Sequence, residues 1–296
     1  RAPGLLARLK APAAWAMFTV NPRRSGNIYA IDGQEVWLIH NYLRDHEADF
    51  DAVDRDWAIR TILGVGEDFE YEQMSREDWI GRRLVSDKLR EGRVFFMGDT
   101  AKIVNPFGAR GGNTGVADAD NLAWKLAAVL RGHADEALLE SFNDERLEAA
   151  QENVKVTRRT ARFLRPADGI ERAFRTATIS LAKQFPFARS LVNTGRMAVA
   201  NTYRGSRICG DNGGTSVQNV RFQWRQGKPG CLNDLVQWAD GRLLILVFGQ
   251  QTKAALKRLQ ELSLSGLPVR CVQVLARGQV AQARRRHRTA PGGHPG

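Results

Sequence analysis

The stretch RVFFMGDTAKIVNPFGARGGNTGV, residues 93–116, decides how this chain folds. Val94 to Met97 is a short unbroken apolar run, which predicts a strand buried on both faces. Gly98 and Asp99 end the run, and a carboxylate at the carboxyl end of a strand lies where open α/β sheets bind ligands. The sequence therefore predicts a buried strand that carries Asp99 to a ligand site.

A glycine-rich loop follows this strand, and a helix follows the loop. The loop contains Pro106, Gly108, Gly111 and Gly112. Glycine permits a positive φ and lets the backbone approach a ligand closely. Asn113 and Thr114 are good N-cap residues, so we predict a helix that begins near them and runs to Leu130.

The first turn of that helix, residues 115–117, contains no acidic residue. Its N–H groups and the positive end of its dipole are therefore free for an electronegative ligand group. The residues alone leave two interpretations open. One is a nucleotide or cofactor site; the other is a strand, a flexible loop and an amphipathic helix in which Asp99 is only a turn residue.

Three ordered segments carry a family resemblance: GRVFFMGDTA at 92–101, PFGARGGNTG at 106–115 and DADNLAWKLA at 118–127. Together they resemble the second FAD-binding motif of the aromatic-ring hydroxylases, the single-component flavoprotein monooxygenases similar to para-hydroxybenzoate and 3-hydroxyphenylpropionate hydroxylases. The resemblance implies an α/β (mixed α+β) fold, namely the C-terminal part of an FAD-binding hydroxylase. Such a part has an antiparallel substrate-domain sheet, long helices and a partial thioredoxin-like C-terminal domain.

The resemblance also implies a cofactor site. By this resemblance Asp99 hydrogen-bonds the ribityl chain of FAD, and the loop and helix start lie against the isoalloxazine ring. The implied cofactor-binding residues are Gly98, Asp99, Pro106, Gly108, Gly111, Gly112, Asn113 and Thr114. The sequence departs from the family pattern at Thr100, at Lys102, where His is usual, and at Asn105. These departures leave the aspartate and the glycines of the motif in place, so they concern the detailed surroundings of the flavin and not its contact residues.

The implied activity is NAD(P)H- and O2-dependent hydroxylation of a phenolic or other aromatic substrate. NADH or NADPH would reduce FAD, and O2 would then form a flavin C4a-hydroperoxide that transfers oxygen. Three alternatives remain open at this point. They are another FAD-dependent oxidoreductase, such as a reductase, oxidase or epoxidase; a non-catalytic remnant; and a basic protein that binds nucleic acid.

The 296 residues allow about two domains. We expect a substrate-binding sheet domain at 1–84, the C-terminal part of the FAD-binding domain at 85–200, a linker at 201–214 and a partial thioredoxin-like domain at 215–296. No G-x-G-x-x-G fingerprint follows a strand anywhere, so the simplest interpretation is an N-terminally truncated chain. We then expect residues 94–97 to lack neighbouring strands, and the chain alone to bind FAD weakly and to be inactive.

Residues 15–50 read as strands at 15–20, 27–31 and 35–42, with a hairpin turn at Asp32-Gly33. Alternation places Val36, Leu38, His40 and Tyr42 on one face of the third strand. His40 and Tyr42 are candidates for contact with a phenolic substrate, because His and Tyr commonly handle protons. The alternative is that both are structural. A helix at 49–63 and a strand at 71–83 are predicted next.

Residues 136–165 predict a long helix, and residues 169–200 a second helix interrupted at Pro186. After the linker, strands at 220–224, 243–248 and 268–275 and a helix at 252–262 resemble a thioredoxin-like domain. Because the domain lacks a CxxC pair, we interpret it as structural or as a contact in a homo-oligomer. The tail beyond 275 lacks the strands that would complete such a domain.

Composition sets further bounds. The formal charge is +12, but its arginine-rich segments lack the interleaved aromatic residues of a stacking platform, so we predict solvated surface and no nucleic-acid partner. Cys209, Cys231 and Cys271 have no zinc-ligand spacing, and no metal site is predicted. With no apolar run near the roughly 20 residues of a membrane span and no signal peptide, a cytoplasmic protein without membrane contact is expected.

Overall fold

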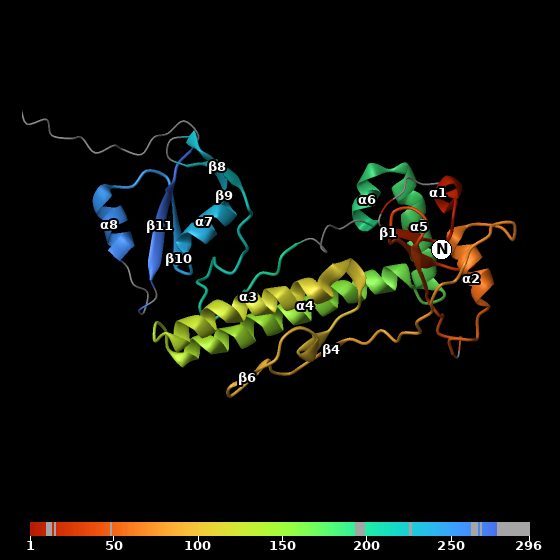
Figure 1. Ribbon diagram of the computed structural model, residues 1–296, viewed down its shortest axis with the longest axis horizontal. Helices are drawn as coiled ribbons and strands as arrows, with labels where there is room; N and C mark the ends of the chain where they lie inside the picture. Colours follow the sequence, from red (N-terminus) through yellow and green to blue (C-terminus); the bar gives the residue numbers. More distant parts are fainter. Residues whose placement is uncertain are drawn as a thin grey trace, which may run out of the picture. The chain divides into compact units, whose positions relative to one another are not determined.

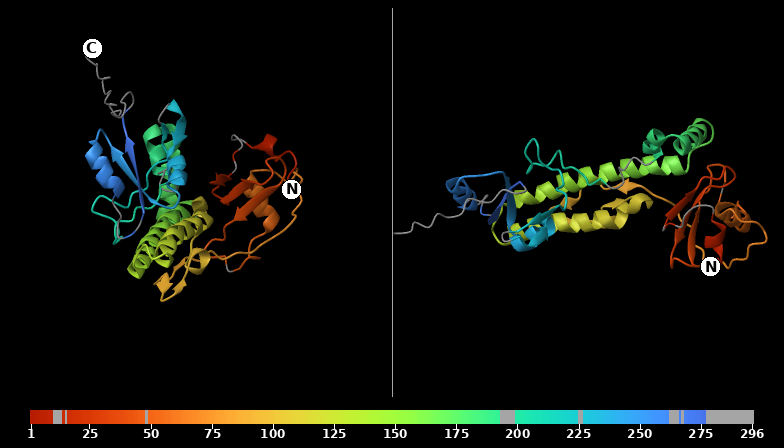
Figure 2. Two further views of the ribbon diagram at one scale, coloured as in Figure 1. Left: turned by 60° about the vertical axis from the view of Figure 1, so that its left-hand side comes forward. Right: turned by 90° about the horizontal axis from the view of Figure 1, so that it is seen from above.

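The computed structural model describes residues 1–9, 14, 16–47, 49–192, 199–224, 227–261, 266 and 268–276. The chain forms two compact units. Unit 1 comprises Arg1–Ala119 and Asn143–Gly205, and unit 2 comprises Asp120–Phe142 and Ser206–Gly296. Two long helices, α3 (Arg110–Leu130) and α4 (Glu140–Leu164), contribute to both units, and within unit 1 the first part of α3 lies beside α4 (Figures 1 and 2).

Unit 1 begins with a three-stranded antiparallel sheet. Its strands are β1 (Ala16–Thr19), β2 (Gly26–Ala30) and β3 (Trp37–Asn41), in that order. Gly33 has a φ of +74° in the turn between β2 and β3, which confirms the predicted hairpin. Helix α1 (Leu5–Arg8) and helix α2 (Arg55–Leu63) lie beside this sheet (Figure 1).

The best-packed core of unit 1 lies between this sheet and its two helices. It consists of Ala2, Leu5, Ile28, Ile62, Leu63 and Phe69, with Trp37 and Ile39 of β3 packed against it. Since Trp37 and Ile39 face this core, His40 is left for the opposite face, as the alternation predicted. Asp54 caps α2 by accepting a hydrogen bond from the Trp57 N–H, so this helix begins later than the predicted residue 49.

The segment between α2 and α3 contains only short elements. They are β4 (Leu84–Val85), β5 (Arg90–Glu91), β6 (Val94–Phe95), the 3-10 turn η1 (Gly98–Thr100), β7 (Lys102–Ile103) and the 3-10 turn η2 (Phe107–Ala109). Strand β4 pairs with β7, and β5 pairs with β6, both antiparallel.

Two sequence predictions for this segment are wrong. Residues 71–83 form no strand, and Ile80 is 66% exposed, because no strand among the described residues pairs with them. The run from Val94 to Met97 is not buried on both faces, since Val94 is 56% exposed and β6 pairs only with β5. This exposure is what we expected of the run in the absence of neighbouring strands.

Helices complete unit 1. α4 follows the 3-10 turn η3 (Glu136–Leu139), which belongs to unit 2. The predicted break at Pro186 separates α5 (Ile170–Gln184) from α6 (Pro186–Val192). Residues 193–198 of the predicted helix lie outside the described residues. No helix in the described part of the chain is long and apolar enough to span a membrane.

Unit 2 contains β8 (Arg221–Gln223), β9 (Pro229–Cys231), α7 (Leu232–Ala239), β10 (Leu243–Phe248), α8 (Lys253–Glu261) and β11 (Val269–Val274). β10 and β11 are parallel, joined through α8, and β8 pairs with β9 as an antiparallel ribbon. Helix α8 lies against β11 and α7 against β10 (Figure 1). The predicted strands and helix are present, whereas β9 and α7 were not predicted.

Candidate functional site

The turn that follows β6 presents Asp99 to solvent. Gly98 has a φ of +57°, and Thr100 fixes the turn because its Oγ1 donates a 2.6 Å hydrogen bond to the Met97 carbonyl. The Asp99 side chain is exposed, and in the described part of the chain no group hydrogen-bonds its carboxylate. The turn therefore holds an uncommitted acid at the end of the strand, as the sequence predicted.

A buried ion cluster contacts this turn through the Gly98 N–H. Asp118 of α3 is fully buried, and its carboxylate forms ion pairs with Lys102 of β7 and with Arg146 of α4, the latter at 2.7 Å from Nε to Oδ1. The Gly98 N–H also donates to Asp118, at 3.0 Å. One carboxylate thus ties together β7, both long helices and the residue that precedes Asp99.

Burial lowers the pKa of Lys102, while its hydrogen bond to Asp118 acts in the opposite direction. Asp99 also raises the pKa of Lys102 through its charge, which places the exposed acid within electrostatic reach of the buried cluster. The buried cluster itself holds two cations and one carboxylate, and the exposed Asp99 carboxylate balances the remaining positive charge.

Hydrogen bonds extend the cluster along the two helices. Arg146 donates to the Tyr203 hydroxyl at 2.6 Å, and Asn153 Nδ2 donates to Thr114 Oγ1 at 3.1 Å. Arg110, at the start of α3, donates to Asn153 Oδ1 at 2.6 Å. The start of α3 is therefore held rigidly against α4, which orients the helix terminus.

Helix α3 begins at Arg110, not near Asn113 or Thr114 as predicted. Gly108 and Ala109 both have positive φ values, +71° and +53°, and this reversal lets the chain enter the helix three residues early. The Asn113 and Thr114 side chains donate back to the carbonyls of Ala109 and Arg110, so both lie inside the helix and neither is an N-cap.

The start of α3 leaves open space beside its backbone. A Cβ atom built on Gly111 or Gly112 would meet no heavy atom within 4 Å. Ala109 adopts a left-handed conformation that costs a non-glycine residue about 1–2 kcal/mol, and backbone strain of this kind is concentrated at ligand sites. The predicted loop residues Pro106, Gly108, Gly111 and Gly112 thus border one open helix terminus.

The sheet brings the two candidate substrate residues to the same loop. The Tyr42 ring lies 6.2 Å from the ring of Phe107, which belongs to η2 between Pro106 and Gly108. The His40 ring lies 6.3 Å from Tyr42 and 5.1 Å from Tyr29. Asn27 Nδ2 donates to the Tyr42 hydroxyl at 2.6 Å. His40 and Tyr42 therefore form one aromatic wall with Phe107 of the glycine loop, which lies more than 60 residues later in the sequence.

Burial perturbs both candidates in the direction of the neutral form. It lowers the pKa of His40 below its ordinary value of 6.5. Burial also raises the pKa of Tyr42 well above its ordinary range, with a smaller contribution from Tyr29. At neutral pH this wall carries no charge, which suits contact with an apolar ring.

His40 is expected to make stability sensitive to acid. Its folded-state pKa lies below the unfolded value, so the unfolded chain binds more protons and stability falls as pH drops below about 6.5. In urea unfolding at about pH 7.5 and about pH 5, His40→Gln should lose less stability than wild type. His46→Gln, at an exposed position, should follow the wild type. Parallel pH dependence in wild type and His40→Gln would contradict this assignment.

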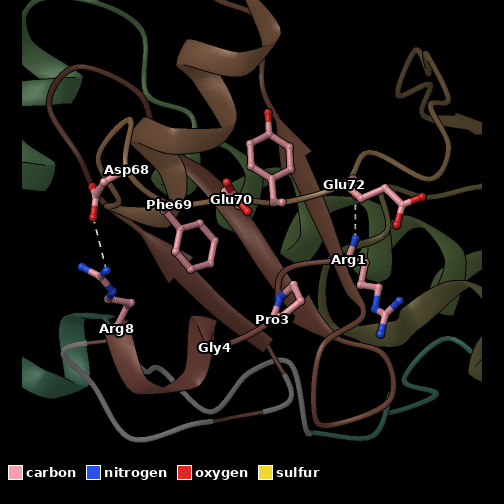
Figure 3. Close-up of a pocket in the computed structure, with 9 residues that line it drawn as sticks. Arg1, Pro3, Gly4, Arg8, Asp68, Phe69, Glu70 and Glu72 are labelled. Carbon is pink, nitrogen blue, oxygen red and sulfur yellow. Dashed lines mark hydrogen bonds and ion pairs between the residues drawn. The ribbon is translucent and has the colours of Figure 1, made fainter.

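Another pocket of unit 1 lies away from this site. It has a volume of about 760 Å3 and is lined by the first residues of the chain and by residues 68–72 (Figure 3). Arg8 and Asp68 pair across it at 3.2 Å, and the Arg1 amine donates to the Glu72 carbonyl. None of its lining residues belongs to the predicted cofactor set.

Sequence reasoning missed the ion cluster. Asp118 lies in the third quoted segment and Lys102 was noted only as a departure from the family pattern, but nothing in the sequence showed that they meet. Arg146 lies within the long helix predicted at 136–165. Acidic and basic residues at helical spacing usually lie on a solvated face, so their burial here had no sequence signal.

Comparison with known proteins identifies the family. The chain belongs to the FAD binding domain family, whose sequence profile matches residues 10–157, half of the chain. This span includes every predicted cofactor residue and both candidate substrate residues. The observed fold is the mixed α/β fold with an antiparallel sheet and long helices that the sequence predicted.

Curated relatives and solved structures agree with this family. The chain is 39% identical over 138 residues to a "putative polyketide hydroxylase" of Streptomyces halstedii, an alignment covering 45% of this chain and 25% of that protein. It is 31% identical over 196 residues to tetracenomycin B2 monooxygenase-dioxygenase of Streptomyces olivaceus, covering 65% and 33% respectively. The rebeccamycin biosynthetic enzyme RebC with reduced flavin matches with a TM-score of 0.67 and 25% identity, over 94% of this chain and 54% of that one.

The chain thus spans about a quarter to a third of these curated relatives and about half of the matched structure.

Proposed function

We propose that this chain forms the second cofactor-binding segment and part of the substrate wall of an FAD-dependent monooxygenase that hydroxylates an aromatic compound. The observation that carries the proposal is the contact between Tyr42 of the sheet and Phe107 of the glycine loop. It brings a neutral aromatic wall beside a loop whose family binds FAD. The relatives' names, which include hydroxylases and monooxygenases, support the same activity.

The residues present fit the cofactor. Asp99 offers an exposed carboxylate that accepts no hydrogen bond from the described residues, as a sugar alcohol chain requires, and the start of α3 has open space at Gly111 and Gly112. We assign Gly98 and Asp99 to the ribityl chain, and Pro106, Gly108, Gly111, Gly112, Asn113 and Thr114 to the ring. Asn113 and Thr114 would contribute through the helix backbone, because their side chains bond to the preceding turn.

When bound, FAD would supply the redox chemistry with O2, and NADH or NADPH would supply the electrons. The chain's own residues would position the cofactor and keep water away from the substrate. The helix terminus at residues 110–112 would favour negative charge on the ring, and the wall of His40, Tyr42 and Phe107 would exclude water from an aromatic substrate. Tyr42 would keep its proton, because burial raises its pKa and Asn27 donates to its oxygen.

The function is tested by titrating FAD into the purified chain and recording the flavin absorbance spectrum. NADH and NADPH oxidation is then followed with a panel of phenols, catechols and polycyclic phenols. Substrate-stimulated oxidation, with one oxygen atom from labelled O2 in the product, would support the monooxygenase. Weak flavin binding without turnover is the result expected of this chain alone. Bound flavin that oxidises NAD(P)H without oxygenating any substrate would instead indicate a flavin reductase, and no flavin binding even at high FAD concentration would contradict the cofactor assignment for this chain.

A carboxylate at the start of α3 should lower the reduction potential of bound flavin. Gly112→Asp fits sterically, since a Cβ there meets no atom within 4 Å, and it opposes the helix dipole that would stabilise reduced, anionic flavin. The expected effect corresponds to about 0.3–1 kcal/mol. Val116→Asp, on the exposed side of the same helix, adds the same charge one turn later and is the control. Equal potentials in wild type and Gly112→Asp would show that this terminus does not face the ring.

A further inference from the structure

A second polar pocket in unit 1 is lined mainly by residues outside the site described above. It lies where the start of β2, the end of β3 and the connection between α4 and α5 meet. Five arginines line it, namely Arg24, Arg44, Arg165, Arg172 and Arg175, together with Tyr42 and Ser25. We call it the arginine pocket. Its volume of about 40 Å3 is enough for one small group.

Three of these arginines already have carboxylate partners. Arg24 is buried and pairs with Glu47 at 2.6 Å, and Arg165 pairs with Asp45 at 2.6 Å. Arg172 pairs with Asp168 one turn earlier. The charges of these three side chains are therefore compensated within the protein.

Arg44 and Arg175 differ from them. The Arg44 guanidinium donates to the carbonyls of Pro22 and Arg23, and the Arg175 guanidinium donates to the carbonyl of Leu164. Within the described ranges neither forms an ion pair with a carboxylate. Arg175 therefore has no carboxylate partner in the described part of the chain, and Arg44 has only an electrostatic attraction to Glu47, whose carboxylate already pairs with Arg24.

Arg175 is also incompletely hydrogen-bonded. Arg175 is 5% exposed, and its Nε is a buried donor that has no hydrogen-bond partner among the described residues. Burial, and the charge of Arg172, lower the pKa of Arg175, which shows that its surroundings disfavour the cation. A buried, unsatisfied donor on a cation is costly, and structures that retain one commonly bind an anion or water there.

We propose that the arginine pocket binds one oxyanion group, a carboxylate or a phosphate, through Arg175 and Arg44. Such a group would add negative charge beside Arg175 and Arg44, and it would accept a hydrogen bond from the Arg175 Nε. Guanidinium groups match both oxyanions geometrically. The small volume admits the acidic group and not a whole molecule, so the remainder of any larger ligand would lie outside. The site does not depend on the proposed monooxygenase activity.

Tyr42 suggests where the rest of a larger ligand would lie. It lines the arginine pocket and also contacts Phe107 of the glycine loop. Two sources share the required chemistry: the acid group of an aromatic compound on the Tyr42 wall, and the phosphate of a nucleotide.

The test is calorimetric titration of the purified full chain with inorganic phosphate and with benzoate, at constant ionic strength in chloride. We expect Arg175→Gln and Arg44→Gln each to weaken binding by about ten-fold or more, as loss of a charge-assisted hydrogen bond would. Arg55→Gln removes the same charge from an exposed pair with Asp51, and it should bind like wild type. Circular dichroism checks the fold; if Arg175→Gln does not fold, the half-exposed Arg44 position decides.

The outcomes separate cleanly. Tighter binding of benzoate than of phosphate, and competition by hydroxybenzoates, would assign the pocket to an aromatic acid. Tighter binding of phosphate, and competition by NADPH, would assign it to a nucleotide. Absence of binding in wild type at millimolar ligand, or equal affinity in wild type and in both pocket variants, would overturn the proposal.

Discussion

Replacing Asp118 with alanine is expected to lower the free energy of unfolding by about 3–5 kcal/mol, the usual cost of removing one partner from a buried ion pair. The loss would be large because Asp118 is the carboxylate that faces both Lys102 and Arg146, which are 3% and 1% exposed. The substitution leaves two buried cations near each other, and it also deprives the Gly98 N–H of its acceptor.

Urea unfolding of the purified chain measures this effect. Asp120→Ala is the matched control, because Asp120 is an exposed aspartate two residues later on the same helix, and its replacement should change stability by no more than about 0.5 kcal/mol. Lys102→Met should lower the free energy of unfolding by less than Asp118→Ala, since Asp118 would still pair with Arg146 and accept the Gly98 N–H. If Asp118→Ala and Asp120→Ala unfold at the same urea concentration, the cluster does not exist as described.

Replacing Asp99 with alanine is expected to weaken FAD binding by roughly 10- to 150-fold, equivalent to about 1.5–3 kcal/mol for a hydrogen bond to a charged group. The structure sharpens this expectation. Asp99 is exposed and accepts no hydrogen bond in the described part of the chain, so its loss should leave the free energy of unfolding almost unchanged. An effect on FAD without an effect on stability would separate a ligand contact from a structural role.

Flavin affinity is measured by fluorescence titration. Asp87→Ala serves as the control, because Asp87 is exposed in the turn before β5 and belongs to no predicted site. Asp99→Asn should recover part of the affinity, since an amide oxygen still accepts a hydrogen bond but carries no charge. Wild-type flavin affinity in Asp99→Ala would remove Asp99 from the cofactor site.

Local sequence patterns predicted many of the elements correctly. The Asp32-Gly33 turn lies between β2 and β3 because its glycine adopts a positive φ, and Pro186 separates α5 from α6 because proline cannot continue a helix. β10, α8 and β11 also follow their apolar spacing. These features depend on residues close together in the chain, which is why periodicity and turn chemistry were sufficient.

Patterns failed where the outcome depended on a distant partner. Residues 71–83 have the composition of a strand but no described strand pairs with them, and a strand is stable only when its backbone groups are paired. Asn113 and Thr114 have the composition of N-caps. The reversal at Gly108 and Ala109 nevertheless starts the helix at Arg110, before either residue is reached.

The sequence by itself determined the family and the identity of the residues proposed to contact FAD. It also determined the order of elements around them: a strand, an acid, a glycine loop and a helix. Only the tertiary structure placed Lys102, Asp118 and Arg146 in one buried cluster beneath Asp99, and brought Tyr42 against Phe107. The physical reason is that charge pairing and ring contact act through space between β7, α3, α4 and the sheet. Local spacing specifies each element, but it does not specify which side chains of separate elements meet when those elements pack.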